Sequence, residues 1–458
     1  MSLEDKVIMV IEQLIKLLSL SELEIEKEFQ KEFLFYWDMQ TTNMPAIKIY
    51  IGYDRVFQKM NVYLNKDASI RIVSNGIKLN DKDKKEDEKR VWEYKYKAPG
   101  YYIPIIDNRR IKPPTKDATW TEKDIKKIIQ GRDIKRISHD TYEKLTHEKI
   151  KTKSVCLIFE MNVEGNAINF CCFIKFKNAI QETLFQKLST AIVSIEPVRS
   201  IRCDFYFLNK QIGNDICVIN KKIAVIGAGS LGSYISTELV KSGMRNLTIY
   251  DADDLQEANV LRHTIKNSWS GLPKVIAMKC DLEKIHPEIE INIVNKYMTS
   301  SRLKEDMDKY DMIIFTVGSS DVQLLCNKIF KTEKYDKLII YAWLEAGGTN
   351  SHILKVDYSK KGCFECLYTD EEGNLVNNKM NKLSDEQIEA STIRNGCGGT
   401  RVAYGTEILL RTTSVLLDTV KKTLRGEFED NCLIDIEFYS VVNRGNAFIE
   451  GKCKCCCD

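Results

Sequence analysis

The stretch KKIAVIGAGSLGS at residues 221–233 decides how this chain folds. Its apolar run at residues 223–226 predicts a buried strand. The next six residues follow the pattern G-x-G-x-x-G, with Gly227, Gly229 and Gly232 in the glycine positions, and predict a turn that opens a helix. Backbone amides at such a helix start bind phosphate groups. The turn therefore indicates a nucleotide site, without saying which reaction takes place there.

Polar residues after the next predicted strand make the site more specific. Asp251 ends that strand about 20 residues after the turn, where a carboxylate accepts ribose hydroxyls, and Asp253 and Asn259 follow it. A dehydrogenase has no need of the cations Arg262 and Lys274, whereas an enzyme that cleaves ATP at its α-phosphate must balance charge developing on the phosphates. We expect these two to be catalytic and the other three to bind nucleotide, although solvated surface charge is the usual role of Arg and Lys.

Apolar runs alternate with helical patterns through this part of the chain. We expect strands at residues 223–226, 247–250, 291–294, 312–316 and 338–342, and helices from Ser230 to about Lys241 and after Pro273. This alternation predicts an α/β fold with a doubly wound, mostly parallel, Rossmann-like sheet. A smaller α+β domain is expected before it.

Changes of pattern divide the chain into three regions. Residues 1–115 begin with helical spacing and continue with alternating residues, which predicts helices and an antiparallel sheet. Residues 116–215 are expected to form an α+β linker domain, and residues 216–458 the nucleotide domain with C-terminal strands. No cysteine precedes Cys156, which excludes a thioester-forming residue from residues 1–155.

Size and composition are those of a globular protein with large cores. The chain has 458 residues, enough for two or three domains, of which 43% are hydrophobic and 29% charged. A net charge of +3 gives no reason to expect nucleic acid or a membrane surface as a partner. Charges interrupt the apolar residues 1–20, so these predict neither a signal peptide nor a membrane span. We therefore expect a cytoplasmic protein whose 15 cysteines are reduced thiols.

The combined motifs resemble those of the ubiquitin-activating, ThiF/MoeB-type adenylyltransferases over residues from about 200 to 425. The glycine turn, Asp251, the N-x-x-R segment at 259–262 and the G-x-x-K segment at 271–274 match the family pattern. The most similar branch is that of the bacterial antiphage systems, the CBASS-type and Bil-type ubiquitin-like conjugation systems, where GSLGS, NVxRH and a later GCG recur together. The resemblance implies that residues 216–458 are an adenylation domain that uses ATP and magnesium.

One position departs from the family pattern. The family carries an Asp after the fourth apolar strand that helps to hold magnesium, but Gly318 occupies the matching place here. Asp321, one helical turn later, is the candidate substitute. The alternative is a carboxylate that the helix dipole alone favours in a first turn.

Cys397 is the predicted nucleophile. It lies in RNGCGGTRVAYG at residues 394–405, where the flanking glycines permit close approach of a peptide and Arg394 and Arg401 favour the thiolate. The segment resembles the loop in which the family carries its thioester. An inert buried thiol is the alternative, because this is the commonest state of a free cysteine.

Cys363 and Cys366 have the spacing of a zinc knuckle. A structural zinc needs four ligands, and ThiF-like relatives place a second pair near the C-terminus, which here would come from Cys453, Cys455, Cys456 or Cys457. The alternative is that Cys363 or Cys366 is the nucleophile. Zinc is therefore a possible cofactor of this chain.

These features predict an activating enzyme that adenylates a ubiquitin-like protein, carries it as a thioester and passes it to a separate ubiquitin-conjugating-like protein, in bacterial antiphage defence. The resemblance also implies a homodimer. One alternative is a sulfur-carrier adenylyltransferase of cofactor biosynthesis. The other is a non-catalytic nucleotide-binding scaffold, for which Gly318 is the best support.

Overall fold

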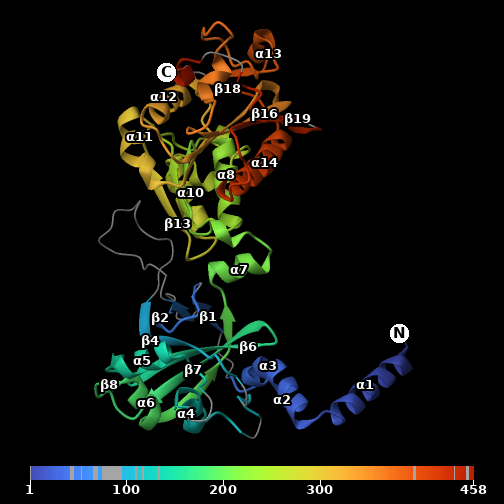
Figure 1. Cartoon of the computed structure of the whole chain (residues 1–458), viewed down its shortest axis with the longest axis vertical. Helices are drawn as coiled ribbons and strands as arrows, with labels where there is room; N and C mark the ends of the chain where they lie inside the picture. The colour runs from blue at the N-terminus through green and yellow to red at the C-terminus, as the bar shows by residue number, and fades with distance from the viewer. Residues whose placement is uncertain are drawn as a thin grey trace. The chain divides into compact units, whose positions relative to one another are not determined.

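The computed structural model describes residues 2–41, 46–52, 54–64, 71–74, 95–108, 111–115, 118–130, 135–395, 399–437, 439–449 and 453–457. The described residues form two compact units, the first up to residue 208 and the second from residue 209 (Figure 1). Across these described ranges, no helix has the length and apolar character needed to cross a membrane.

One mixed sheet organises the first unit, in the strand order β10–β1–β3–β2–β4–β6–β7–β9. Parallel pairs join β1 to β10, β1 to β3 and β4 to β6, and the remaining pairs are antiparallel. The strands are β1 (Ile47–Tyr50), β2 (Gln58–Leu64), β3 (Arg71–Ser74), β4 (Lys95–Pro104), β6 (Ser154–Val163), β7 (Asn166–Phe176), β9 (Ile192–Val198) and β10 (Ser200–Arg202), with β5 (Lys149–Ile150) and β8 (Glu182–Thr183) paired separately.

The structure joins the two regions, residues 1–115 and 116–215, that the sequence separates. Strand β4 from the first region pairs in parallel with β6 from the second, with Gly100 opposite Cys156 and Pro104 opposite Glu160. Separating the regions there would leave the backbone groups of two edge strands unpaired, which costs free energy. A parallel pair between distant segments leaves no local turn signal, so the sequence pattern suggests a boundary where the sheet is continuous.

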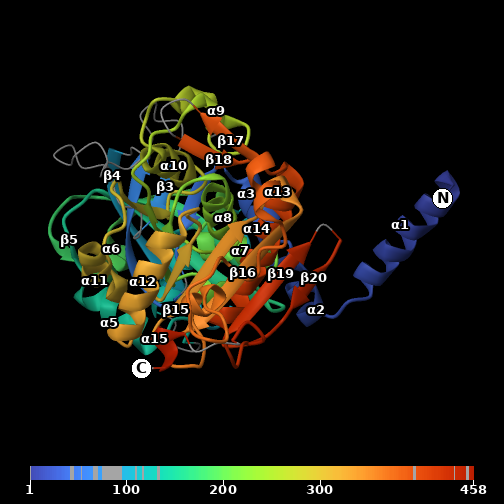
Figure 2. The same ribbon diagram turned by 90° about the horizontal axis from the view of Figure 1, so that it is seen from above.

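Helices cover one face of this sheet around an aromatic core. The helices of this unit are α1 (Leu3–Leu18), α2 (Glu22–Lys31), α3 (Phe33–Met39), α4 (Glu122–Gln130), α5 (His139–His147) and α6 (Leu184–Thr190). Phe33 and Trp37 of α3 lie within 5 Å of the Phe170 ring of β7, at centroid distances of 4.7 and 4.9 Å. Helix α1 buries none of its residues and extends away from the body of the unit (Figures 1 and 2).

The second unit contains the predicted doubly wound sheet, in the order β13–β12–β11–β14–β15–β16–β19–β20. The first five strands are parallel and the last three pairs antiparallel. The α/β fold class is therefore confirmed. The strands are β11 (Lys222–Ile226), β12 (Asn246–Tyr250), β13 (Glu290–Val294), β14 (Met312–Phe315), β15 (Leu338–Leu344), β16 (Asn350–Asp357), β19 (Cys432–Glu437) and β20 (Val441–Asn443).

Helices lie on both faces of this sheet. Figures 1 and 2 show α8 and α14 on one side and α11 and α12 on the other. The helices are α8 (Ser230–Lys241), α9 (Glu257–Val260), α10 (Lys274–Glu283), α11 (Ser300–Asp306), α12 (Ser320–Thr332), α13 (Asp385–Ala390), α14 (Thr406–Leu424) and α15 (Lys454–Cys457), and α7 (Phe205–Gln211) spans the division between the units. The short 3₁₀ segments are η2 (Ile216–Val218), η3 (Asn267–Trp269), η4 (Met307–Lys309), η5 (Ala346–Gly348) and η6 (Phe364–Tyr368), and a hairpin is formed by β17 (Thr392–Asn395) and β18 (Gly399–Val402).

The strand order reverses at β11. The chain runs from β11 outward to β12 and β13, and then returns to place β14 on the other side of β11. Ligands in open α/β sheets bind outside the carboxyl ends of the strands at such a switch point. The site is therefore expected between the turn after β11 and the turn after β14.

Candidate nucleotide site and cysteine cluster

The glycine turn after β11 depends on glycine at two of its three glycine positions, and the third caps helix α8. Gly227 has φ +98°, a conformation that disfavours other residues. A Cβ on Gly232 would lie 1.8 Å from the carbonyl oxygen of Gly227, so only glycine fits there. Gly229 caps α8, and a Cβ there would meet nothing within 4 Å. Two glycines thus shape the turn, while the third leaves the helix start open to a ligand.

Asp251 at the end of β12 is fixed by backbone amides. Its Oδ2 accepts a hydrogen bond from the Ala228 amide at 2.6 Å, and its Oδ1 accepts one from the Asp253 amide at 2.8 Å. The side chain therefore connects the glycine turn to the loop after β12. Each carboxylate oxygen retains a second lone pair for a ribose hydroxyl.

Lys274 lies between two carboxylates. Its Nζ is 2.8 Å from Oδ2 of Asp253 and 3.7 Å from Oδ1 of Asp251, and only 9% of its side chain is exposed. A cation held at the first residue of α10 by these partners is already oriented before any ligand binds. The structure brings Asp251, Asp253 and Lys274 together, and their roles in nucleotide binding and catalysis stay predictions.

These residues line a cavity of about 370 Å³ at the switch point. The glycine turn provides Gly227 and Gly229, and the segment after β14 provides Thr316, Gly318 and Ser319. Lys296 and Tyr297, which follow β13, also line it. The lining contains two carboxylates and two lysines, so its charges balance.

Asn259 and Arg262 are held by neighbours within the protein. Oδ1 of Asn259 accepts the Gln256 amide at 3.0 Å and so caps α9. Nη1 of Arg262 donates to the hydroxyl of Tyr404 at 3.0 Å, and its Nε is buried without a hydrogen-bond partner among the described residues. The cavity lining above comes from other residues, so direct phosphate contact by Asn259 and Arg262 stays a prediction.

His263 orients the glycine turn. The Ile265 amide donates to its Nδ1 at 3.2 Å, so Nε2 carries the proton and donates to the Ala228 carbonyl at 2.8 Å. Burial lowers the pKa of His263 to about 4. The imidazole is therefore neutral near pH 7 and acts as a structural donor rather than a base.

The predicted magnesium residue lies on the first turn of α12. Asp321 is exposed, and from this segment Gly318, Ser319 and Val322 line the cavity. Thr316 and Ser319, which carry hydroxyl oxygens, flank Gly318 in the sequence and line the cavity. Gly318 is the position at which the family carries its Asp. Asp321 as a magnesium ligand stays a prediction.

The predicted nucleophile Cys397 lies outside the described residues, between β17 and β18. Other thiols of this unit are poor nucleophiles, since burial raises the pKa of Cys326 to about 12 and that of Cys432 to about 11. Burial also raises the pKa of Cys280.

Four thiols meet where η6 packs against the C-terminal helix α15. Sγ of Cys363 lies 4.0 Å from that of Cys366 and 3.6 Å from that of Cys453, and Cys366 lies 3.8 Å from Cys456. Sulfurs at the corners of a tetrahedron around zinc, about 2.3 Å from the metal, are about 3.8 Å apart. The set Cys363, Cys366, Cys453 and Cys456, called here the cysteine cluster, therefore fits a structural zinc.

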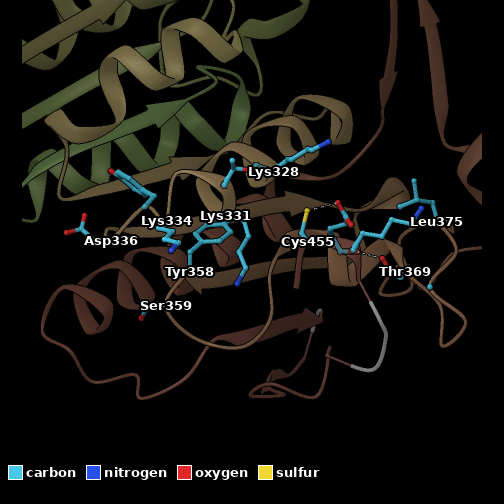
Figure 3. A pocket seen from close by; sticks show the side chains of 14 residues that line it. Lys328, Lys331, Lys334, Asp336, Tyr358, Ser359, Thr369, Leu375 and Cys455 are labelled. Atoms are coloured by element: carbon cyan, nitrogen blue, oxygen red, sulfur yellow. Dashed lines mark hydrogen bonds between the residues drawn. The ribbon is translucent and has the colours of Figure 1, made fainter. Parts of the chain in front are cut away.

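The structure selects the second pair that the sequence left open. Cys455 is not among the four thiols whose sulfurs lie within 4.8 Å of one another. Its Sγ donates to Oε2 of Glu365 at 3.1 Å, as Figure 3 shows from the adjoining cavity. A role of Cys363 or Cys366 as nucleophile is disfavoured, because both side chains are fully buried.

The cavity beside the cysteine cluster is basic. It has a volume of about 850 Å³, and Lys328, Lys331, Lys334 and Lys454 line it (Figure 3). None of these four lysines forms an ion pair with a carboxylate in the part of the chain that the structure describes. Four thiolates around one divalent cation carry a net negative charge, and the four lysines outnumber the two carboxylates of the lining, Asp336 and Glu365, so the surroundings are compatible with that charge.

Comparison with known proteins assigns the second unit to a family. The model of the ThiF family matches residues 217–423. Residues 217–423 of this chain therefore form a ThiF-family domain. The match covers the switch-point cavity and its charged residues, and it ends before the second half of the cysteine cluster.

Proteins named as activating or transferase-like enzymes are among those similar in sequence to this chain. "Ubiquitin-like modifier-activating enzyme 5" of Caenorhabditis elegans is 26% identical over 198 residues, which are 40% of this chain and 45% of that protein. "ATP-dependent ubiquitin transferase-like protein Cap2" of Pseudomonas aeruginosa is 20% identical over 416 residues, 86% of this chain and 70% of that protein. This chain thus spans under half the length of the first relative.

A crystal structure of Escherichia coli MccB with succinimide has a TM-score of 0.40 and 17% identity, over 52% of this chain and 67% of MccB.

Several lining residues were not predicted from the sequence. Lys296, Thr316 and Ser319 immediately follow the carboxyl ends of β13 and β14. That position is the available signal, because parallel strands present their carboxyl ends at one edge of the sheet. Tyr404 carries no such signal, since it reaches Arg262 from a segment 142 residues away.

Proposed function

We propose that this ThiF-family protein adenylates the C-terminus of a ubiquitin-like protein, carries it as a thioester on Cys397 and delivers it to a separate conjugating protein, in bacterial antiphage defence. The observation that carries the proposal is the convergence of Asp251, Lys274 and the open start of α8 on one cavity. ATP is recognised by groups of these kinds, with a carboxylate for the ribose and amides and a cation for the phosphates.

The chemistry has two steps. A carboxylate oxygen of the partner attacks the α-phosphorus of ATP, and the bond to the bridging oxygen breaks so that pyrophosphate leaves. Lys274 and Arg262 offset the negative charge that develops on the phosphates. The Cys397 thiolate then attacks the acyl carbon, the acyl–phosphate bond breaks, and AMP leaves with the electron pair. Holding ATP and the tail together supplies much of the rate.

A separate conjugating protein is favoured by the state of the thiols in the first unit. Cys156, Cys171 and Cys172 are fully buried in the sheet. Burial raises the pKa of Cys172 and that of Cys203. These are all the cysteines up to residue 208, and a thioester carrier must be an accessible and nucleophilic thiol. The first unit is therefore unsuited to receive the acyl group.

The antiphage role rests on similarity. The P. aeruginosa relative named Cap2 aligns with 86% of this chain, so the similarity extends over both units to a protein named as ubiquitin transferase-like. Magnesium and ATP are the cofactors that the family chemistry requires, and a ubiquitin-like protein is its protein substrate. A homodimer is the assembly that we expect from the family.

The test is exchange of labelled pyrophosphate into ATP by the full chain, with magnesium and the ubiquitin-like protein encoded beside its gene. We expect Arg262→Ala and Lys274→Ala to slow exchange by about 10²-fold or more, while Lys241→Ala, an exposed lysine of α8, leaves it unchanged. Exchange that survives both cavity variants would reject the assignment. Adenylation without any reducible adduct would favour a sulfur-carrier enzyme, and ATP binding without exchange a scaffold.

A further inference from the structure

Arg262 has an incomplete set of partners. One guanidinium nitrogen, Nη1, donates to the hydroxyl of Tyr404 at 3.0 Å, and Nε is buried with no acceptor in the described structure. Arg262 is half-buried, its Nε is shielded from solvent, and the one hydrogen-bond partner shown here for its guanidinium is a neutral phenol, which offers no counter-charge. Such a side chain is poised for an anionic ligand that completes its hydrogen bonds.

The partner of Arg262 is held on a rigid backbone. The Gly347 amide donates to the Ala403 carbonyl at 2.9 Å, and the Ala403 amide donates to the Ser391 carbonyl at 2.9 Å. Gly348 has φ +69°, and a Cβ there would lie 2.8 Å from the Gly405 amide and 3.1 Å from Cα of Tyr404. Tyr404 therefore rests directly on η5, which follows β15 of the central sheet.

Arg262 itself lies on a less constrained segment. Helix α9 has only four residues, and the next residue, Leu261, has 94% of its side chain exposed. Its neighbour His263 is anchored to the glycine turn, as described above. The guanidinium thus needs a second fixed point to keep one orientation, and the Tyr404 hydroxyl supplies it.

We propose that Tyr404 is a positioning residue for adenylation, whose hydroxyl holds the Arg262 guanidinium so that its remaining donors are ready for a phosphate oxygen of ATP. This inference rests on the proposed use of ATP. It also means that the segment after β18 contributes to nucleotide binding through Arg262. The tyrosine hydroxyl is the specific requirement, because phenylalanine preserves the ring and its packing.

The experiment is a double-mutant cycle on equilibrium binding of Mg-ATP, measured by calorimetry on the full chain without any protein partner. The proteins are the wild type, Tyr404→Phe, Arg262→Ala and the double variant, with Tyr439→Phe as the matched control because 91% of that tyrosine is exposed. We expect Tyr404→Phe to weaken binding about 3- to 10-fold, the usual effect of one hydrogen bond. In the Arg262→Ala background it should have no further effect.

A second variant tests the support beneath the tyrosine. Gly348→Ala places a methyl group against the Tyr404–Gly405 backbone and should weaken Mg-ATP binding like Tyr404→Phe, again only while Arg262 is present. The outcomes distinguish failure of the positioning role of Tyr404 from failure of the proposed use of ATP. This inference alone would be overturned if Tyr404→Phe lowered Mg-ATP affinity equally in proteins with Arg262 and with Arg262→Ala. It would also be overturned if Tyr404→Phe left the affinity unchanged while Arg262→Ala lowered it. No Mg-ATP binding by the wild type would overturn the proposed function together with it.

Discussion

Replacing Cys453 by serine tests the cysteine cluster most directly. Three sulfur–sulfur separations in the cysteine cluster, 3.6, 3.8 and 4.0 Å, bracket the value of about 3.8 Å for a tetrahedral zinc site. We expect about one zinc per chain in the wild type and loss of most of it in Cys453→Ser. Cys455→Ser is the matched control, because Cys455 is nearby in the sequence but is not one of the four thiols that lie within 4.8 Å of one another.

The size of the stability effect follows from mass action. A metal present at about 1,000 times its dissociation constant stabilises the folded state by about 4 kcal/mol. A unit of this size loses about 2–4 °C of melting temperature per kcal/mol. Cys453→Ser, or removal of the metal with a chelator, should therefore lower the melting temperature of the second unit by about 8–16 °C. Below that transition pyrophosphate exchange should persist, because the cysteine cluster lies outside the nucleotide cavity lining.

Metal analysis, X-ray absorption and thermal denaturation measure these quantities. Absorption at the zinc edge should show about four sulfur ligands at about 2.3 Å. The reasoning is refuted if the purified wild type holds no zinc after expression with zinc, or if Cys455→Ser loses as much metal as Cys453→Ser. A nitrogen or oxygen ligand in the absorption spectrum would contradict the four-sulfur assignment.

Three further predictions concern the nucleotide domain. Cys397→Ala should retain pyrophosphate exchange but lose the reducible adduct with the ubiquitin-like protein, as seen on non-reducing gels, because adenylation needs no thiol. Gly232→Ala should lower the melting temperature and abolish exchange, since its Cβ would lie 1.8 Å from a carbonyl oxygen, whereas Gly229→Ala should keep the melting temperature. Lowering the pH from 7.5 to 5 should cost about 2 kcal/mol of stability through His263, whose pKa falls from 6.5 unfolded to about 4 folded. The unfolded state takes up the proton first, so stability is lost as pH falls, and chemical denaturation of His263→Gln should not show this loss.

The parallel sheet was readable from the sequence because its signals are local. Each buried strand is a short apolar run, and the predicted strands agree with β11 to β15 to within two residues at each end. Helix α8 begins and ends as predicted, at Ser230 and Lys241. The continuous sheet of the first unit was missed, because the parallel pairing of β4 with β6 depends on contacts that no local pattern encodes.

The same distinction between local and distant contacts applies to the functional residues. Asp251 and Lys274 follow a motif of fixed spacing, so their meeting was predictable. The choice of Cys453 and Cys456 over Cys455 was not, because it depends on how the short helix α15 presents its thiols to η6, 90 residues away. The spacing of cysteines along the chain identifies those that could bind zinc, and the packing of α15 against η6 determines which of them come together.

The charges of the cavity bear on the roles proposed for Arg262 and magnesium. Two carboxylates, Asp251 and Asp253, face two lysines, Lys274 and Lys296, so the lining contributes no net positive charge to an ATP triphosphate. Lys274 is further offset by its ion pair with Asp253 at 2.8 Å. Phosphates in a partly desolvated site require more positive charge than Lys274 and Lys296 supply beside these two carboxylates. A divalent ion and the incompletely partnered guanidinium of Arg262 would supply that charge, which places the orientation of this arginine at the centre of the proposed reaction.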